Sequence, residues 1–221
     1  MIKESVFKKY TDEETFKKIV DYPSVTSMWE SCLKNYLDKP AIIDGETYTF
    51  NQIDSEVKKV RAFLKEKGIQ KGDRVGILMP NSVNFAVSFL AITTLGAVAV
   101  LLPPHLDEMA VFGSSLKFQL KGLISFTAFE EKLNLIKQKN PSVILMDENS
   151  KLDGDVPCVE VDGKDACAII FTGGTTGKNK GALLSNQAVL RGVKKRLLWH
   201  ERRFWFKILT RIAIDARIWA Y

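Results

Sequence analysis

The chain contains one long stretch without a charged side chain, running from the residue after Arg74 to Leu102 and the two prolines beyond it. As a membrane span, this stretch would carry a proline and two asparagines near one end and a glycine inside. As strand, helix and strand, each feature has a place. The predicted elements are a strand at 75–79, a turn and helix cap at 80–82, a helix marked by Phe85, Phe89 and Ile92 and ended by Gly96, and a strand at 97–102. Two uncharged strands around a helix indicate a parallel sheet buried on both faces, with no transmembrane segment.

The rest of the chain alternates short apolar runs with charged amphipathic segments. Asp44-Gly45 lies between two such runs and predicts a tight hairpin. The other predicted elements are hairpin strands at 41–43 and 47–50, a helix at 51–67 ended by Gly68, a helix at 106–120, a strand at 123–126, a helix at 129–139, and strands at 143–146 and 166–171. Strands and helices alternating at this spacing predict an α/β fold with a largely parallel sheet flanked by helices.

Charge divides the chain unevenly. The 221 residues carry a net charge of +6, and 194–221 holds eight basic and two acidic residues, which accounts for all of it. Three of the four tryptophans also fall there. We therefore expect a helical lead-in at 1–39, a domain at 40–193, and an atypical basic, Trp-rich tail at 194–221.

Three cysteines lie far apart in the sequence, at Cys32, Cys158 and Cys167. Without a CxxC pair or a neighbouring histidine they predict packing in a reducing compartment and no metal site. The charged N-terminus has no apolar segment typical of a signal peptide. We expect a cytoplasmic protein.

A segment rich in Gly, Thr and Lys follows the last apolar strand, from Thr172 to Gly181. Glycines let successive backbone N–H groups curl around an anion, hydroxyls add donors, and lysine adds charge. This composition predicts a phosphate-binding loop, the alternative being a solvated surface turn. The loop does not match G-x-x-x-x-G-K-[ST], because Thr172 stands at the first glycine and Asn179 follows the lysine.

The loop sequence FTGGTTGKNKG resembles [YF]-T-S-G-[TS]-T-G-x-P-K-G, the signature of the AMP-forming adenylating enzymes. It departs from that signature at Gly173, where serine is usual, and at Asn179, where proline is usual. The resemblance covers about residues 30–193. It includes AIIDGETYTFNQIDSEVKKVRAFLKEKG and KGDRVGILMPNSVNFAVSFLAITTLGAVAVLLPP before the loop, and GALLSNQAVL after it.

The resemblance implies a ligase with ATP and Mg²⁺ as cofactors. A carboxylic acid, fatty or other, would attack the α-phosphate of ATP, and the CoA thiol would then take the acyl group. By matching positions, the phosphates would be wrapped by Thr172, Gly173, Gly174, Thr175, Thr176 and Gly177, and Lys180 would supply charge. His105, at a predicted strand end, has either a substrate-contacting or a structural role.

The resemblance also implies parts that this chain does not contain. The adenine and magnesium segment, the ribose-binding aspartate and the C-terminal domain with its catalytic lysine have no counterpart here. We therefore identify no catalytic residue and no metal ligand. We expect an incomplete N-terminal fragment that is inactive by itself and poorly soluble.

Two hypotheses account for the basic tail. An extra base in a run of A at Lys194-Lys195 would shift the reading frame. Read one base later, every Trp codon gives Gly, and one permitted reading ends in a segment like the family's P-[LM]-x-H-x-x-G. The alternative is a non-catalytic nucleotide-binding or interaction module whose tail is an amphipathic helix that binds membrane or nucleic acid. On the first hypothesis we expect no nucleic-acid partner.

Overall fold

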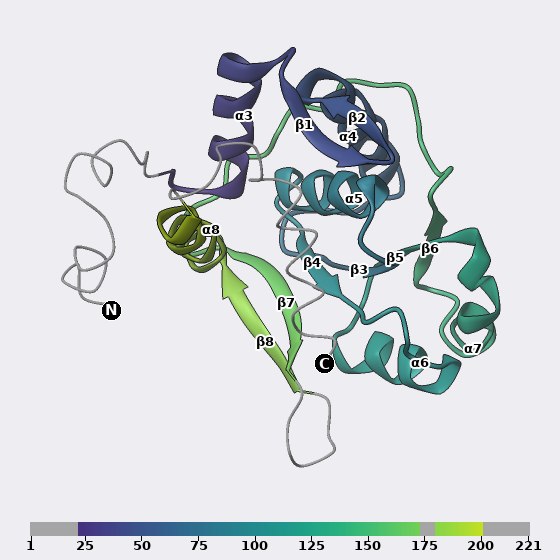
Figure 1. Ribbon diagram of the computed structural model, residues 1–221. Helices are drawn as coiled ribbons and strands as arrows, with labels where there is room; N and C mark the ends of the chain where they lie inside the picture. Colours follow the sequence, from purple (N-terminus) through teal and green to yellow (C-terminus); the bar gives the residue numbers. More distant parts are fainter. Residues whose placement is uncertain (1–21, 173–179, 201–221) are drawn as a thin grey trace.

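The computed structural model describes residues 22–172 and 180–200. Its centre is a six-stranded sheet in the order β6-β5-β3-β4-β7-β8 (Figure 1). All neighbouring strands are parallel except β7 and β8, which pair antiparallel at one edge. The strands are β3 (Arg74–Leu78), β4 (Val98–Leu101), β5 (Gly122–Ser125), β6 (Ile144–Asp147), β7 (Ala166–Thr172) and β8 (Lys180–Ser185).

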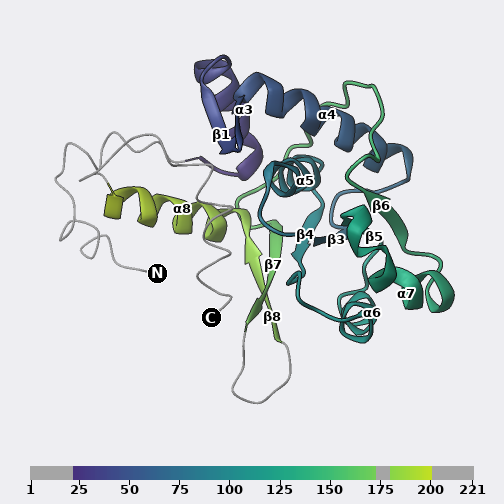
Figure 2. The same ribbon diagram turned by 45° about the vertical axis from the view of Figure 1, so that its right-hand side comes forward.

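Helices cover both faces of the sheet (Figure 2). On one face lie α3 (Val25–Tyr36), α4 (Phe50–Glu66), α5 (Val83–Thr94) and α8 (Asn186–His200). On the other lie α6 (Glu108–Lys117), the 3-10 helix η1 (Thr127–Leu133) and α7 (Asn134–Lys139). Successive side chains along a strand point alternately into two hydrophobic cores, one on each face of the sheet. Val75 and Ile77 of β3 pack with the first group of helices, whereas Leu78 packs with the second.

The uncharged stretch folds as β3, α5 and β4, which confirms the strand–helix–strand prediction. Its lack of charge follows from its position, because α5 lies between the sheet and α4 and is buried on nearly every side. Ser82 caps the helix by accepting a hydrogen bond from the Phe85 N–H at 3.2 Å. No helix of the described residues combines the length and apolar character needed to cross a bilayer.

The predicted hairpin is confirmed as β1 (Pro40–Asp44) and β2 (Glu46–Thr49), which pair antiparallel. Gly45 in its turn has a φ of +72°, a conformation that glycine adopts without strain. Helix α4 begins where the hairpin ends. Thr49 and Gln52 form a capping box there, each side chain accepting the other residue's backbone N–H.

Two predicted elements differ from the structure. The helix expected at 129–139 is 3-10 up to Leu133 and α-helical only from Asn134. Its N-cap residue Phe126 makes no side-chain capping bond, and the Thr127 N–H donates instead to the Glu148 carboxylate, 2.8 Å away in the loop after β6. The loop expected at 171–181 is shorter, because β7 extends to Thr172 and β8 begins at Lys180.

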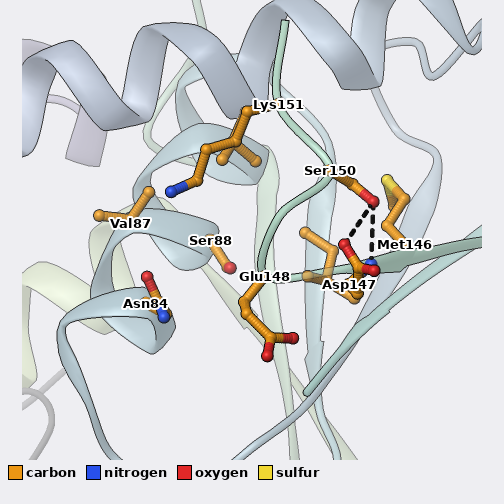
Figure 3. A pocket seen from close by; sticks show the side chains of 10 residues that line it. Asn84, Val87, Ser88, Met146, Asp147, Glu148, Ser150 and Lys151 are labelled. Carbon is orange, nitrogen blue, oxygen red and sulfur yellow. Dashed lines mark hydrogen bonds between the residues drawn. The ribbon is translucent and has the colours of Figure 1, made fainter. Parts of the chain in front are cut away.

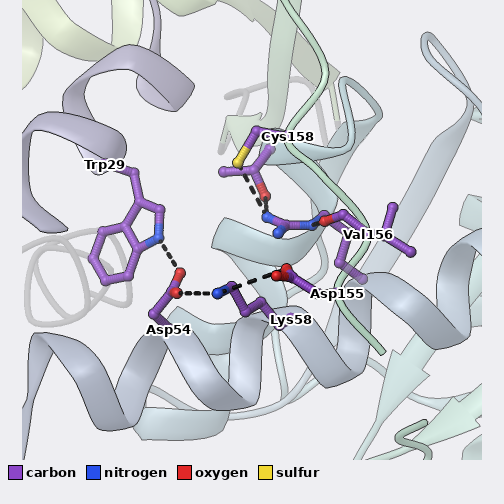
Figure 4. A network of polar contacts seen from close by, with 8 residues as sticks. Trp29, Asp54, Lys58, Asp155, Val156 and Cys158 are labelled. Carbon is purple, nitrogen blue, oxygen red and sulfur yellow. Dashed lines mark hydrogen bonds and ion pairs between the residues drawn. The ribbon is translucent and has the colours of Figure 1, made fainter. Parts of the chain in front are cut away.

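A buried polar network ties α4 to the irregular segment before β7 (Figure 4). Arg61 of α4 is 2% exposed and donates from Nε to the Val156 carbonyl at 2.7 Å. Its Nη1 donates to Thr94 Oγ1 at 3.0 Å and to Cys158 Sγ at 3.2 Å. Beside it, the Trp29 indole N–H donates to Asp54 at 3.0 Å. The network fixes a segment that has no regular structure of its own against the first core.

The expected boundary after residue 39 falls between α3 and β1, and the one after residue 193 falls inside α8. Helix α3 belongs to the first core, in which Trp29 is fully buried. Helix α8 continues past position 193, the last residue before the expected basic tail, as far as His200. Residues 201–221 lie outside the described residues.

Candidate phosphate-binding site

The predicted phosphate loop connects the two strands of an antiparallel hairpin. In the β7–β8 register Thr172 faces Lys180, and this is the last pair before the loop. Lys180 is exposed. The structure therefore brings the first and last predicted site residues next to each other. Gly173, Gly174, Thr175, Thr176 and Gly177 lie outside the described residues, so their contacts stay a prediction.

The loop leaves the sheet at the carboxyl edge of the parallel strands. Strand β7 runs parallel to β4, with Ile170 beside Leu101, so the chain after β4 emerges at the same edge. His105 lies in that connection and is exposed. Lys132 holds the connection by donating to the Pro104 carbonyl at 2.6 Å. Ligands of open α/β sheets bind at this edge, which places the loop and His105 on the appropriate side of the molecule.

Aromatic packing supports the base of the hairpin. Phe118, just after α6, meets Phe171 of β7 edge-to-face, with ring centroids 5.2 Å apart. A Cβ added at Gly181 would lie 2.5 Å from Phe118 Cε1 and 2.9 Å from Ile169 Cγ2. Glycine is therefore the residue that fits beneath the ring. Sequence reasoning missed Phe118, and the only signal was the glycine that ends the loop motif.

The cysteines occupy packing positions. Cys167 of β7 is buried, and burial raises the pKa of its thiol to about 12. Burial likewise raises the pKa values of the half-buried Cys32 and Cys158 thiols. All three are free cysteines. Among residues 22–172 and 180–200, no three His, Cys, Asp or Glu side chains gather in a way that could hold a metal ion.

A family model described as AMP-binding enzyme matches residues 29–220. The chain belongs to this AMP-binding family. It is 28% identical over 175 residues to 4-coumarate–CoA ligase 1 of Petroselinum crispum, a match that covers 72% of this chain and 32% of that enzyme. The chain spans about a third of the length of the curated relatives it matches.

Solved structures agree with the family assignment. The inhibitor-bound N-terminal domain of FACL13 from Mycobacterium tuberculosis superposes with a TM-score of 0.71 at 25% identity, covering 79% of this chain and 47% of that one. A long-chain-fatty-acid–CoA ligase from Archaeoglobus fulgidus superposes with a TM-score of 0.72 at 19% identity, covering 81% and 40%. The expected fold, a partial N-terminal domain of an adenylate-forming enzyme with a largely parallel sheet, is confirmed.

A surface hollow in this AMP-binding chain lies away from the hairpin, where β5 and β6 end beside α4 and α5 (Figure 3). It encloses about 290 Å³, including space open to solvent. Two of its polar residues bond to each other, and a third bonds to a residue outside the lining. Ser150 Oγ donates to Asp147 Oδ1 at 2.9 Å, and Lys151 Nζ donates to Glu56 at 2.6 Å. Two strands, β3 and β4, separate it from the hairpin. It is not the predicted phosphate site.

Proposed function

We propose that this chain is the N-terminal part of an AMP-forming acid–thiol ligase and that its β7–β8 loop binds the β- and γ-phosphates of ATP. The observation that carries the proposal is the hairpin itself. Its last pair, Thr172 and Lys180, lies at the carboxyl edge of the sheet, which supports a phosphate site in the Gly- and Thr-rich sequence that joins the two strands. The family membership supports ATP as the nucleotide.

The loop's chemistry is positioning and charge stabilisation. Backbone N–H groups and threonine hydroxyls would hold the phosphates still, while Lys180 offsets their negative charge. When bound, Mg²⁺ would neutralise further phosphate charge. Gly173 supplies no hydroxyl where the family has serine, and Asn179 gives the loop more freedom than proline does. We expect this loop to hold phosphate more weakly than a loop with the full signature.

For the whole reaction we propose the family chemistry, in which an acyl-adenylate forms and the CoA thiol accepts the acyl group. The acid is a fatty acid or another acyl acid. We propose that the 221-residue chain by itself binds nucleotide without forming acyl-CoA. Acyl-CoA or pyrophosphate release by the purified chain would refute the inactivity.

The binding proposal is tested by titrating the chain with ATP in a calorimeter. Lys180→Gln should weaken ATP binding by about tenfold, because one full charge leaves the phosphate site. Lys164→Gln is the matched control, since Lys164 is also exposed but lies before β7, at the opposite end of the hairpin. Equal affinities in the wild type and both variants would refute the assignment.

For the tail we propose the shifted reading frame. The DNA should then contain a run of A at the codons for Lys194 and Lys195, and the following frame should continue the ligase pattern. An intact frame would reject this proposal and favour the alternative of a basic membrane- or nucleic-acid-binding tail. Binding of the full chain to anionic vesicles or DNA would then be the next measurement.

A further inference from the structure

We infer that Phe118 is a positioning residue for the phosphate loop, acting through its contact with Gly181 at the base of the β7–β8 hairpin. The inference rests on the proposed function of that loop. It adds a residue at the end of helix α6, 63 positions before Gly181, to those that set the position of the last hairpin pairs before the loop.

The backbone of Phe118 is held from three sides. Its N–H donates to the Ser114 carbonyl at 3.0 Å and so ends helix α6. Its own carbonyl accepts a hydrogen bond from Arg74 Nη1 at 2.8 Å, at the start of the central strand β3. The next residue, Gln119, turns the chain with a φ of +51°. The ring therefore projects from the end of α6, where the backbone is bonded both to its own helix and to the side chain of Arg74 on β3.

The ring has little room to move. Phe118 is 8% exposed, and its ring meets Phe171 at a centroid distance of 5.2 Å. Its Cε1 and Cζ atoms fill the space where Gly181 would carry a Cβ, at 2.5 and 2.9 Å. Ile169 limits the same space from the side, with Cγ2 at 2.9 Å.

This contact lies one residue pair from the loop. Gly181 faces Phe171, and the next pair, Thr172 and Lys180, is the last before the loop. Strand β8 lies at the edge of the sheet and pairs only with β7. The ring packs on the face of the hairpin that carries Ile169 and Phe171, so it contacts β8 from that face in addition to the pairing with β7. A displaced ring would shift Lys180 relative to Thr172, and displacements of about 1 Å in positioning residues can cost about a hundredfold in function.

The test introduces a steric clash between position 181 and the Phe118 ring in one variant and removes the clashing ring atoms in a second. Gly181→Ala inserts a methyl group against the ring, Phe118→Leu removes the two ring atoms that would clash, and the double variant carries both changes. Gly76→Ala is the matched control. Its Cβ would lie 2.5 Å from Leu123 Cδ1 and 2.9 Å from Leu120 Cδ1, an equal clash, but on β3 and away from the hairpin.

Three quantities are measured on the full chain: the melting temperature, the ATP affinity of the folded protein, and hydrogen exchange at Thr172 and Lys180. We expect Gly181→Ala to weaken ATP binding about tenfold and to speed exchange at both amides. Relative to Phe118→Leu alone, the double variant should lose less ATP affinity than Gly181→Ala loses relative to the wild type; the remaining loss reflects Ile169 Cγ2, which still lies 2.9 Å from the added Cβ. Gly76→Ala should lower the melting temperature without changing ATP affinity or exchange at the hairpin.

Additive effects of the two substitutions, or the same loss of ATP affinity in Gly76→Ala, would overturn the inference. So would unchanged exchange at Thr172 and Lys180 in Gly181→Ala. A wild-type chain that does not bind ATP would refute the proposed function instead. In that case the exchange data and the recovery in the double variant still decide whether Phe118 positions the hairpin.

Discussion

Replacing Arg61 by methionine tests whether the buried network around α4 stabilises the domain. Methionine keeps most of the aliphatic volume and removes the charged donors. The guanidinium makes two hydrogen bonds to oxygen, to the Val156 carbonyl at 2.7 Å and to Thr94 at 3.0 Å. Thr94 keeps a bond to the Leu90 carbonyl at 2.6 Å after the change, whereas the Val156 carbonyl loses its guanidinium donor. At about 1.5 kcal/mol for each bond from a charged donor, the loss amounts to about 3 kcal/mol.

The cost of burying the Arg61 charge opposes the stabilisation from its hydrogen bonds, so the sign of the measured change shows which of the two is larger. Burying a charge costs free energy, and replacing buried ionic groups with apolar ones is neutral or stabilising in some proteins. Arg61 is 2% exposed, so it bears that cost almost fully. We expect the hydrogen bonds to prevail, because they connect α4 and α5 to a segment that has no regular structure to hold it in place.

The assay is equilibrium unfolding in urea, with hydrogen exchange at Val159. The Val159 N–H donates to the Thr94 carbonyl at 2.8 Å and reports on the attachment of that segment. Arg61→Met should lower the free energy of unfolding by about 3 kcal/mol and speed exchange at Val159. Arg191→Met, an exposed arginine that bonds only within its own helix to Gln187, should change it by less than about 0.5 kcal/mol. A neutral or stabilising Arg61→Met would refute the reasoning.

Two further predictions concern an exposed edge and a buried thiol. Leu183 on the edge strand β8 is 64% exposed, so Leu183→Lys should reduce concentration-dependent association in light scattering; unchanged association would contradict a role for this edge. Burial raises the pKa of Cys167 to about 12, so at pH 8 the folded chain holds this group as an unreactive thiol. Mass spectrometry after maleimide treatment should show Cys167 modified only in urea, and rapid modification of the folded chain would contradict the burial.

The sequence predicted those helices, strands and turns whose formation depends on residues close together in the chain. The uncharged stretch after Arg74 predicted β3, α5 and β4 because a helix covered on both sides has no face for charge. Asp44-Gly45 predicted the hairpin, since its turn needs the positive φ that Gly45 adopts. Regular alternation of such elements was enough to predict a largely parallel α/β sheet.

Contacts between distant residues were not predictable in the same way. Nothing near Arg61 indicates that it is buried, because its partners at Val156 and Cys158 are 95 and 97 positions away. The contact between Phe118 and Gly181 likewise depends on the order of the strands, which brings β4 and α6 beside β7. A single sequence carries no sign of that order, so the loop motif could be found while its support could not.

The hairpin also bears on the phosphate site that we propose for this loop. In a loop that runs from a strand into a helix, the helix N-terminus contributes positive charge to the bound phosphate. Here the chain returns along β8, and α8 begins at Asn186, at the end of β8 opposite the loop. The first backbone donors of α8 are already engaged, since the Asn186 and Gln187 N–H groups donate to the Asp165 and Gly163 carbonyls at 3.0 and 2.9 Å. Because α8 begins at the far end of β8, its N-terminus does not face the loop, and we expect positive charge to come from lysine side chains and from the loop's own N–H groups. Lys180, paired with Thr172 at the mouth of the hairpin, is therefore the position at which removing one charge should matter most.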